Sequence, residues 1–165
     1  MLLEGSCHCG SVHFTVRSAQ PYPFNLCYCS ICRKTAGGGG YAINLGANNE
    51  TLKVDGIDCV SVYQAKMRDA GTGKVKESPG RRHFCSKCGS ALWSWDPRWP
   101  ELVHPFASAI DTELPVPPEH THMMLNSKAS WVEAHVGAED KMFDAYPLES
   151  LAEWHQRLGL EDRND

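Results

Sequence analysis

Seven of the eight cysteines in this chain fall into three short clusters, and this clustering constrains the fold more than any other feature. The clusters are Cys7-His8-Cys9-Gly10, Cys27-Tyr28-Cys29-Ser30-Ile31-Cys32 and Cys85-Ser86-Lys87-Cys88-Gly89. Two cysteines only two positions apart would close a small, strained ring as a disulfide, whereas both sulfurs can readily face one metal ion. The spacing therefore predicts metal sites rather than cross-links.

The first and third clusters together predict one closed, structural four-cysteine zinc site. In an extended segment, residues i and i+2 face the same side, so Cys7 and Cys9 can reach one ion. Cys85 and Cys88 have the spacing of a zinc knuckle. The glycine after each pair permits a turn with positive φ, which aims backbone N–H groups at the sulfurs. Such a site would tie together a long stretch of chain, which removes roughly 4–5 kcal/mol of unfolded-state entropy.

The middle cluster predicts a different kind of site. Cys27, Cys29 and Cys32 can hold one face of a second zinc ion and leave a fourth position for water or a substrate, which is typical of a catalytic zinc. Any other division of the seven cysteines splits this triad or leaves thiols without a role. Cys59 stands alone in a strand-like segment, which favours a small buried hydrophobe. The alternative is that Cys59 closes the middle site as its fourth ligand.

Composition and charge exclude several classes of protein. The 165 residues suit a single domain spanning 1–165, and the net charge of −4 gives no support to nucleic-acid binding. The N-terminus lacks the basic and apolar regions of a secretory signal, and no stretch is apolar enough to span a membrane. Eight cysteines could form four disulfides in a secreted protein, but without a signal we expect a cytoplasmic protein whose thiols bind metal.

The hydrophobic pattern predicts a mainly β fold with few helices. A segment with glycines, a proline and charges, 69–80, predicts an exposed loop, and 115–120 a proline-rich connection. A short helical turn is expected at 30–36. A longer helix is expected at 148–158, between Pro147 and Gly159, with a polar tail at 161–165. Its expected buried face comprises Leu148, Leu151, Ala152, His155 and Leu158. Strands are predicted at 11–17, 40–45, 51–54, 58–63, 91–95 and 102–107.

With these clusters, the chain resembles the glutathione-dependent formaldehyde-activating enzyme family, to which centromere protein V is related. The likeness runs in order from Gly5 to Pro147, and three cysteine motifs in the right order are specific where one alone would be weak. Ser130 stands where the family usually has a proline. The matching segments are Gly5-Ser6-Cys7-His8-Cys9-Gly10-Ser11-Val12, Cys27-Tyr28-Cys29-Ser30-Ile31-Cys32-Arg33-Lys34, Phe84-Cys85-Ser86-Lys87-Cys88-Gly89-Ser90, His122 and Ser127-Lys128-Ala129-Ser130-Trp131.

The resemblance implies a β-tent, Mss4-like core that carries two zinc ions per chain. It implies an activity that joins glutathione to formaldehyde, giving S-hydroxymethylglutathione, which is classed as a carbon–sulfur lyase. It implies one structural zinc and one zinc at which chemistry occurs. The implied structural ligands are Cys7, Cys9, Cys85 and Cys88, and the implied catalytic ligands are Cys27, Cys29 and Cys32, the same division that the count of cysteines gives.

A zinc ion held by three cysteines suits thiol chemistry. It can accept a substrate thiol and lower the pKa of that thiol, and the thiolate can then attack an aldehyde carbon held beside it. Three cysteinates outweigh the charge of the ion, which fits delivery of a thiol better than activation of water. We therefore expect a small thiol such as glutathione and a small aldehyde as partners, and no nucleic acid or membrane.

Three residues are candidates for substrate binding. Arg33 and Lys34 directly follow the triad and could attract an anionic thiol, and His122 matches a position of the family. The competing interpretations are solvated surface charge for the first two and a structural histidine for the third. Trp93, Trp95, Trp99 and Phe106 could line a cleft, although an aromatic core cluster is the favoured interpretation.

Two other functions remain open from the sequence. The chain could be a non-catalytic, zinc-stabilised interaction module, although its charge balance and small size argue against a basic partner-binding face. It could also perform a related carbon–sulfur or dehalogenating reaction on another small molecule. Fold alone does not decide between these functions.

Overall fold

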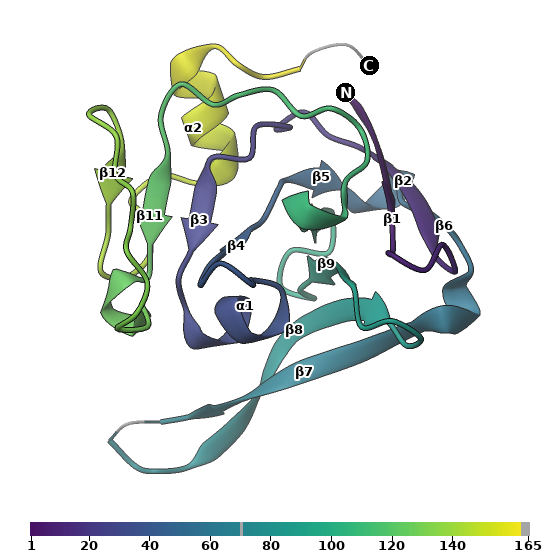
Figure 1. Ribbon diagram of the computed structural model, residues 1–165, viewed down its shortest axis with the longest axis horizontal. Coiled ribbons are helices and arrows are strands. Elements are labelled where there is room, and N and C mark those ends of the chain that lie inside the picture. The colour runs from purple at the N-terminus through teal and green to yellow at the C-terminus, as the bar shows by residue number, and fades with distance from the viewer. Residues whose placement is uncertain (70, 163–165) are drawn as a thin grey trace.

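In the computed structural model, which describes residues 1–69 and 71–162, the strands form three sheets (Figure 1). The first sheet contains β1 (Leu2–Ser6), β2 (His13–Arg17) and β6 (Lys53–Asp55), all antiparallel. The second has the order β5 (Ala47–Asn48), β10 (Leu102–Pro105), β9 (Ala91–Trp95), β8 (Val75–Cys85) and β7 (Val60–Arg68). The third has the order β12 (Lys141–Met142), β11 (Thr121–Met123), β3 (Asn25–Cys27) and β4 (Ala42–Ile43), with β11 parallel to both β3 and β12.

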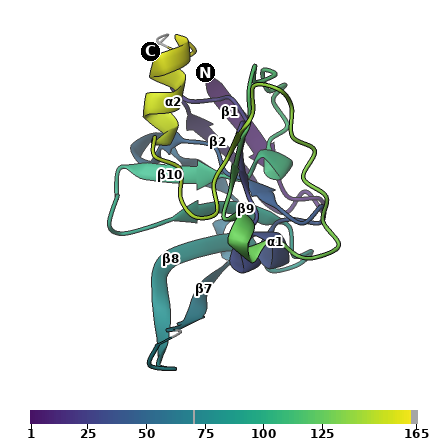
Figure 2. The same ribbon diagram turned by 90° about the vertical axis from the view of Figure 1, so that its left-hand side faces the viewer.

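Strands β7 and β8 form a long hairpin that extends away from the rest of the molecule (Figures 1 and 2). The prediction of an exposed loop over 69–80 is therefore wrong for its second half, because β8 begins at Val75. Pro79 misled the prediction, since proline cannot donate to a sheet ladder. The pairing register of the two strands shifts between Gln64 and Lys66, opposite Pro79, so this residue falls in a bulge where strand pairing is interrupted anyway.

The two α-helices in the described residues are short. Helix α1 (Ser30–Thr35) confirms the predicted helical turn, and Cys29 caps its N-terminus through its own sulfur. Four 3₁₀ helices lie at Asn49–Thr51, Ile57–Cys59, Ala107–Ala109 and Leu125–Ser127. No helix in the described part of the chain has the length and apolar character needed to cross a bilayer.

Helix α2 (Leu151–Leu158) confirms the C-terminal helix, but it begins three residues later than predicted. Ser150 and Glu153 form a capping box, which sets the first turn more strongly than Pro147 does. Leu148 is consequently 94% exposed, and the face that packs inward carries Trp154 and His155. Gly159 ends the helix with φ of 66°, as the sequence predicts. Residues 163–165 of the predicted tail lie outside the described residues.

The main hydrophobic core lies between the first and second sheets. Leu3, Val12 and Val103 are fully buried there, and Phe14 packs edge-on against Trp93 with ring centroids 5.2 Å apart. Cys7 and Cys85 belong to this core, while a smaller cluster surrounds Cys27, Cys32 and Phe106. Each of the two cysteine groups that could hold a metal therefore has two members anchored in packed structure.

Candidate metal centres and their pocket

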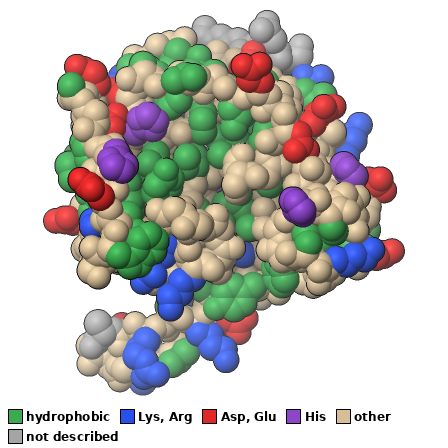
Figure 3. All heavy atoms as spheres, viewed as in Figure 1, with side chains coloured by type: hydrophobic (Ala, Val, Ile, Leu, Met, Phe, Trp, Pro, Cys, Tyr) green, Lys and Arg blue, Asp and Glu red, His purple; other side chains and the backbone are tan. Residues whose placement is uncertain are grey.

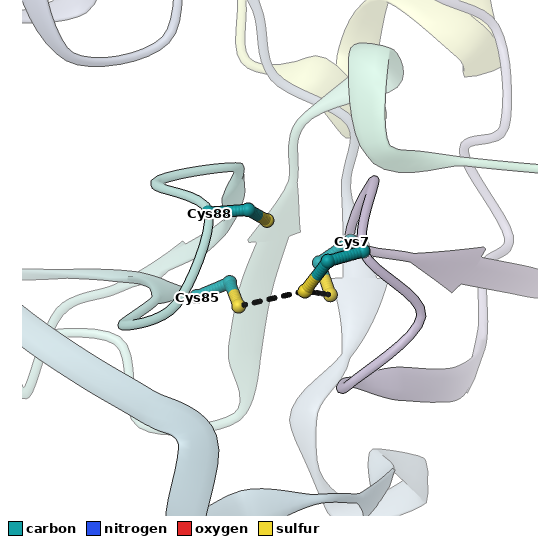
Figure 4. A group of neighbouring side chains, drawn as sticks. Cys7, Cys85 and Cys88 are labelled. Carbon is teal, nitrogen blue, oxygen red and sulfur yellow. Dashed lines mark hydrogen bonds between the residues drawn. The ribbon is translucent and has the colours of Figure 1, made fainter.

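The four sulfurs of Cys7, Cys9, Cys85 and Cys88 all lie within 4.8 Å of one another. Cys7 and Cys9 come from the turn between β1 and β2, and the other two come from the end of β8 and the turn that follows it (Figure 4). The Sγ atoms of Cys7 and Cys9 are 3.5 Å apart, and those of Cys9 and Cys85 are 3.8 Å apart. A tetrahedral zinc with Zn–S bonds of about 2.3 Å separates its sulfurs by about 3.8 Å, so these residues fit the ion.

Hydrogen bonds around this group favour an ionised Cys88, whereas burial raises the pKa of Cys85 to about 11. Gly10 and Gly89, the glycines that follow the two pairs, have φ of 71° and 76°, which confirms the predicted positive-φ turns. The amide of Val12 donates to Cys7 Sγ at 3.2 Å. The Ser90 hydroxyl and backbone amide lower the pKa of Cys88 to about 5. Thiolates are the form of cysteine that a metal ion binds.

The sulfurs of Cys27, Cys29 and Cys32 form a second group within the same 4.8 Å limit. Cys27 ends β3, Cys29 is the N-cap of α1 and Cys32 lies inside α1, so the strand-to-helix turn brings them together. Contacts with the thiols of Cys27 and Cys32, and then hydrogen bonds from backbone amides, lower the pKa of Cys29. Contacts with the thiols of Cys29 and Cys32, and then burial, raise the pKa of Cys27. Three clustered thiols, one of them readily ionised, fit a thiophilic metal such as zinc.

Cys59 does not complete this second group. It ends a 3₁₀ helix, packs against the main core, and its carbonyl accepts the backbone N–H and the hydroxyl of Ser86. The interpretation of Cys59 as a fourth ligand of the middle cluster is therefore wrong. The prediction of a buried hydrophobe holds in part, because Cys59 packs against the core but is only half-buried. All eight cysteines are free thiols, in agreement with metal sites in place of disulfides.

The three-cysteine group opens on a pocket of about 550 Å³. One wall is the β7–β8 hairpin, which contributes residues of β8 on both sides of its bulge. These are Lys76, Ser78, Pro79, Gly80 and Arg82. Trp95 and Trp99 form an apolar part of the lining, whereas Trp93 and Phe106 are buried in the core. Trp95 and Trp99 thus agree with the interpretation of a cleft lining, and Trp93 and Phe106 agree with that of an aromatic core.

Charged and polar groups gather around the same pocket. Arg98 forms an ion pair with Asp96 at 2.7 Å, and Lys76 lies exposed on the hairpin. Arg82 Nη2 donates to Cys32 Sγ at 3.4 Å. Tyr146 is exposed overall, but desolvation of its hydroxyl and the nearby thiols raise the pKa of Tyr146, so its hydroxyl keeps its proton at neutral pH.

The sequence pointed to none of Arg82, Lys76 or Tyr146. Lys76 falls in the predicted loop at 69–80, and Arg82 follows it in a part of β8 that the sequence did not predict as a strand. Tyr146 lies in an irregular segment after β12, where no periodic pattern operates. Only the folded structure shows that these three residues line the same pocket as the triad.

The expected substrate-binding residues lie elsewhere. Arg33 and Lys34 line a separate hollow, together with Gly37 and Ser90. Their role in substrate binding stays a prediction, which their position outside the triad pocket does not favour.

His122 is 1% exposed and lies outside the lining of the pocket. Its Nδ1 atom is 2.9 Å from the Tyr28 hydroxyl, and its Nε2 atom is 3.2 Å from Asp140 Oδ2. Tyr28 stands between Cys27 and Cys29 in the sequence, so this buried network helps to hold the triad segment in place. Substrate binding by His122 likewise stays a prediction, and its contacts favour the structural alternative.

Comparison with known proteins identifies the family of this chain. Residues 2–127 match the family described as glutathione-dependent formaldehyde-activating enzyme. A relative from Halomonas elongata, whose name marks it as a candidate enzyme of this kind, is 64% identical over 162 residues, or 98% of this chain and 99% of the relative. A crystal structure of a Rhodobacter sphaeroides protein superposes with a TM-score of 0.50 and 26% identity, over 68% of this chain and 91% of that one. The chain therefore belongs to the glutathione-dependent formaldehyde-activating enzyme family.

Proposed function

We propose that this protein is a zinc-dependent enzyme that joins a small thiol such as glutathione to formaldehyde or a similar small aldehyde. In the reverse direction it would act as a carbon–sulfur lyase. The observation that carries the proposal is the pocket onto which the thiols of Cys27, Cys29 and Cys32 open. Among the described residues, no other cysteine belongs to this group. We infer two zinc ions per chain, one held by each cysteine group, and a reducing compartment such as the cytoplasm.

The division of labour follows from the two geometries. Four cysteines fill a tetrahedral zinc and leave it a structural role. When bound by Cys27, Cys29 and Cys32, a zinc ion would supply a free coordination position for a substrate thiol and would lower the pKa of that thiol. In the reaction, the thiol sulfur forms a bond to the carbonyl carbon, the C=O π pair moves to oxygen, and the thiol proton ends on the new hydroxyl.

The residues around the pocket have separate tasks in this proposal. Lys76 supplies positive charge that attracts the carboxylates of glutathione, while Arg98 is already paired with Asp96. Trp95 and Trp99 offer apolar walls that help to exclude water. The Tyr146 hydroxyl, which keeps its proton at neutral pH, is suited to donate to the oxygen that becomes negative as the carbon–sulfur bond forms.

The test combines a metal count with binding. We expect two zinc equivalents in the wild type, one in Cys29→Ala, and two in the control Cys59→Ala. Isothermal titration with glutathione should give a binding signal for the wild type and for Cys59→Ala, and none for Cys29→Ala. Wild-type protein that neither binds thiols nor changes its cobalt spectrum on thiol addition would instead support the non-catalytic interaction module.

A further inference from the structure

We propose that Arg82 is a positioning residue of the three-cysteine site, which offsets the negative charge of its thiolates so that a further thiolate can join them. The inference rests on the proposed function, because it presumes that the group binds a metal ion and a substrate thiol. Arg82 lies in the second sheet, whereas Cys27 ends a strand of the third sheet, and the cysteine motifs do not include Arg82.

The contacts of Arg82 fix its guanidinium beside the triad. Nη2 donates to Cys32 Sγ at 3.4 Å, although 50 positions separate the two residues. The guanidinium carbon also lies 5.9 Å from the centre of the Phe106 ring, within the range of a cation–π contact. Arg82 is half-buried in the middle of β8, paired with Tyr63 on β7 and Ser94 on β9. Its cation is therefore held in place rather than free to turn toward solvent.

The charge of the site explains why a cation is needed there. Three thiolates and one divalent ion sum to one negative charge, and a substrate thiolate would add another. Without compensation, this repulsion opposes the binding of the substrate in its reactive form. Within residues 1–69 and 71–162, Arg82 is the cationic side chain that donates a hydrogen bond to a sulfur of the triad. Arg98 is neutralised by Asp96, and Lys76 is exposed to solvent.

The second guanidinium nitrogen adds an independent observation. Arg82 Nη1 is buried and has no hydrogen-bond partner among the described residues. A buried donor without an acceptor costs free energy, so its retention is best explained by an acceptor that the site acquires in its working state. An arginine can hold Cys32 with one nitrogen and offer the other to such an acceptor, whereas a lysine presents a single ammonium.

The experiment measures the metal site of the full-length protein directly. Zinc affinity is obtained by competition with a chelator of known affinity, and cobalt is substituted to record the sulfur-to-metal charge-transfer band. The variants are Arg82→Gln and Arg82→Lys, and the matched control is Arg81→Gln. Arg81 is the exposed neighbour on the same strand, and its guanidinium lies 5.1 Å from the Trp95 ring, not on a cysteine.

We expect Arg82→Gln to bind its weaker zinc about tenfold less tightly, as is typical when a hydrogen bond to a metal ligand is lost. Its cobalt band should move to longer wavelength, because a sulfur without that bond holds its electrons less tightly. Arg82→Lys should recover part of both effects, and Arg81→Gln should match the wild type. The four-cysteine cobalt band serves as an internal check that each variant is folded.

The outcomes separate the inference from the proposed function. If Arg82→Gln is folded and keeps both the affinity and the band of the wild type, Arg82 is not a positioning residue. Where Arg82→Gln fails to fold, Arg82→Met takes its place because it removes the charge and keeps an extended side chain. A wild-type affinity and band in that variant would overturn the inference equally. A wild type that binds a single metal ion refutes the proposed function, and the inference with it.

Discussion

Cys9 Sγ lies 3.8 Å from Cys85 Sγ although 76 positions separate the two residues in the chain. The contact joins the turn after β1 in the first sheet to the end of β8 in the second sheet. One metal ion at this point would hold the two sheets at the edge of the main core, to which Cys7 and Cys85 also belong. The four-cysteine group is thus placed to stabilise the fold rather than to meet a substrate.

Loss of this group should destabilise the whole protein. We expect Cys88→Ala to release one zinc and to lower the free energy of unfolding by at least about 3 kcal/mol, or the Tm by about 10 °C. The control Cys59→Ala removes a half-buried thiol outside the group, and its cost should stay near 1 kcal/mol. Calorimetry and a metal count provide the test. Equal Tm values for the two variants would show that the four-cysteine site is not structural.

A matched pair of variants compares how much a lysine in the triad pocket and a lysine in the separate hollow contribute to glutathione binding. We expect Lys76→Gln to raise KM for glutathione up to about fivefold with little change in kcat, because an exposed charge contributes about 1 kcal/mol or less. Lys34→Gln should leave KM unchanged, since Lys34 lines the separate hollow. Steady-state kinetics decide the matter. A larger effect at Lys34 than at Lys76 would restore the substrate-binding role predicted from the sequence.

Asp140 should make the stability of the protein depend on acid pH. Burial alone would raise its pKa, but the amides of Gly137 and His120 and the ring of His122 outweigh this and hold the pKa of Asp140 at about 2. The unfolded value is about 3.9, so the contribution is fully present above that pH and is lost as the pH falls toward 2. We expect Asp140→Asn to cost about 1–2 kcal/mol at pH 7.

Urea denaturation of both proteins between pH 2 and pH 7 provides the measurement. The difference between Asp140→Asn and the wild type should shrink toward zero near pH 2, and loss of metal in acid affects both proteins alike. Glu139→Gln, at the exposed neighbouring acid, is the control and should show no such trend. A difference that stays constant over the whole range would contradict the prediction.

Trp154 should be the residue that docks the C-terminal helix. Its ring stacks on Phe24 with centroids 3.7 Å apart, and its indole N–H donates to Glu119 at 3.0 Å. We expect Trp154→Ala to cost about 3–5 kcal/mol of stability, and Trp154→Phe less, because it keeps the stacking. Trp99→Ala, at a tryptophan that is 49% exposed, should cost less than about 1 kcal/mol. Denaturant unfolding curves would contradict the prediction if the two alanine variants behaved alike.

Local features of the fold could be predicted because local rules govern them. Strand β9 was predicted with its observed bounds, 91–95, from its apolar and aromatic residues. The start of α2 was misplaced, although Ser150 and Glu153 carry a capping signal in the sequence that outweighs the proline. The hairpin was missed because glycines and a proline predict a loop unless the bulge that accommodates them is known.

The sequence by itself determined the two cysteine pairs and the triad, because thiols two or three residues apart can reach one metal ion through local geometry. The meeting of Cys7 and Cys9 with Cys85 and Cys88 depends on how the first and second sheets pack. The sequence could not place Arg82, Lys76 and Tyr146 beside Cys27, Cys29 and Cys32. Their positions depend on the register of β8 and on how three sheets pack, which are sums of many weak contacts between distant segments. The pairs and the triad are thus specified by the chain locally, and the pocket that gives the triad a use exists only in the folded molecule.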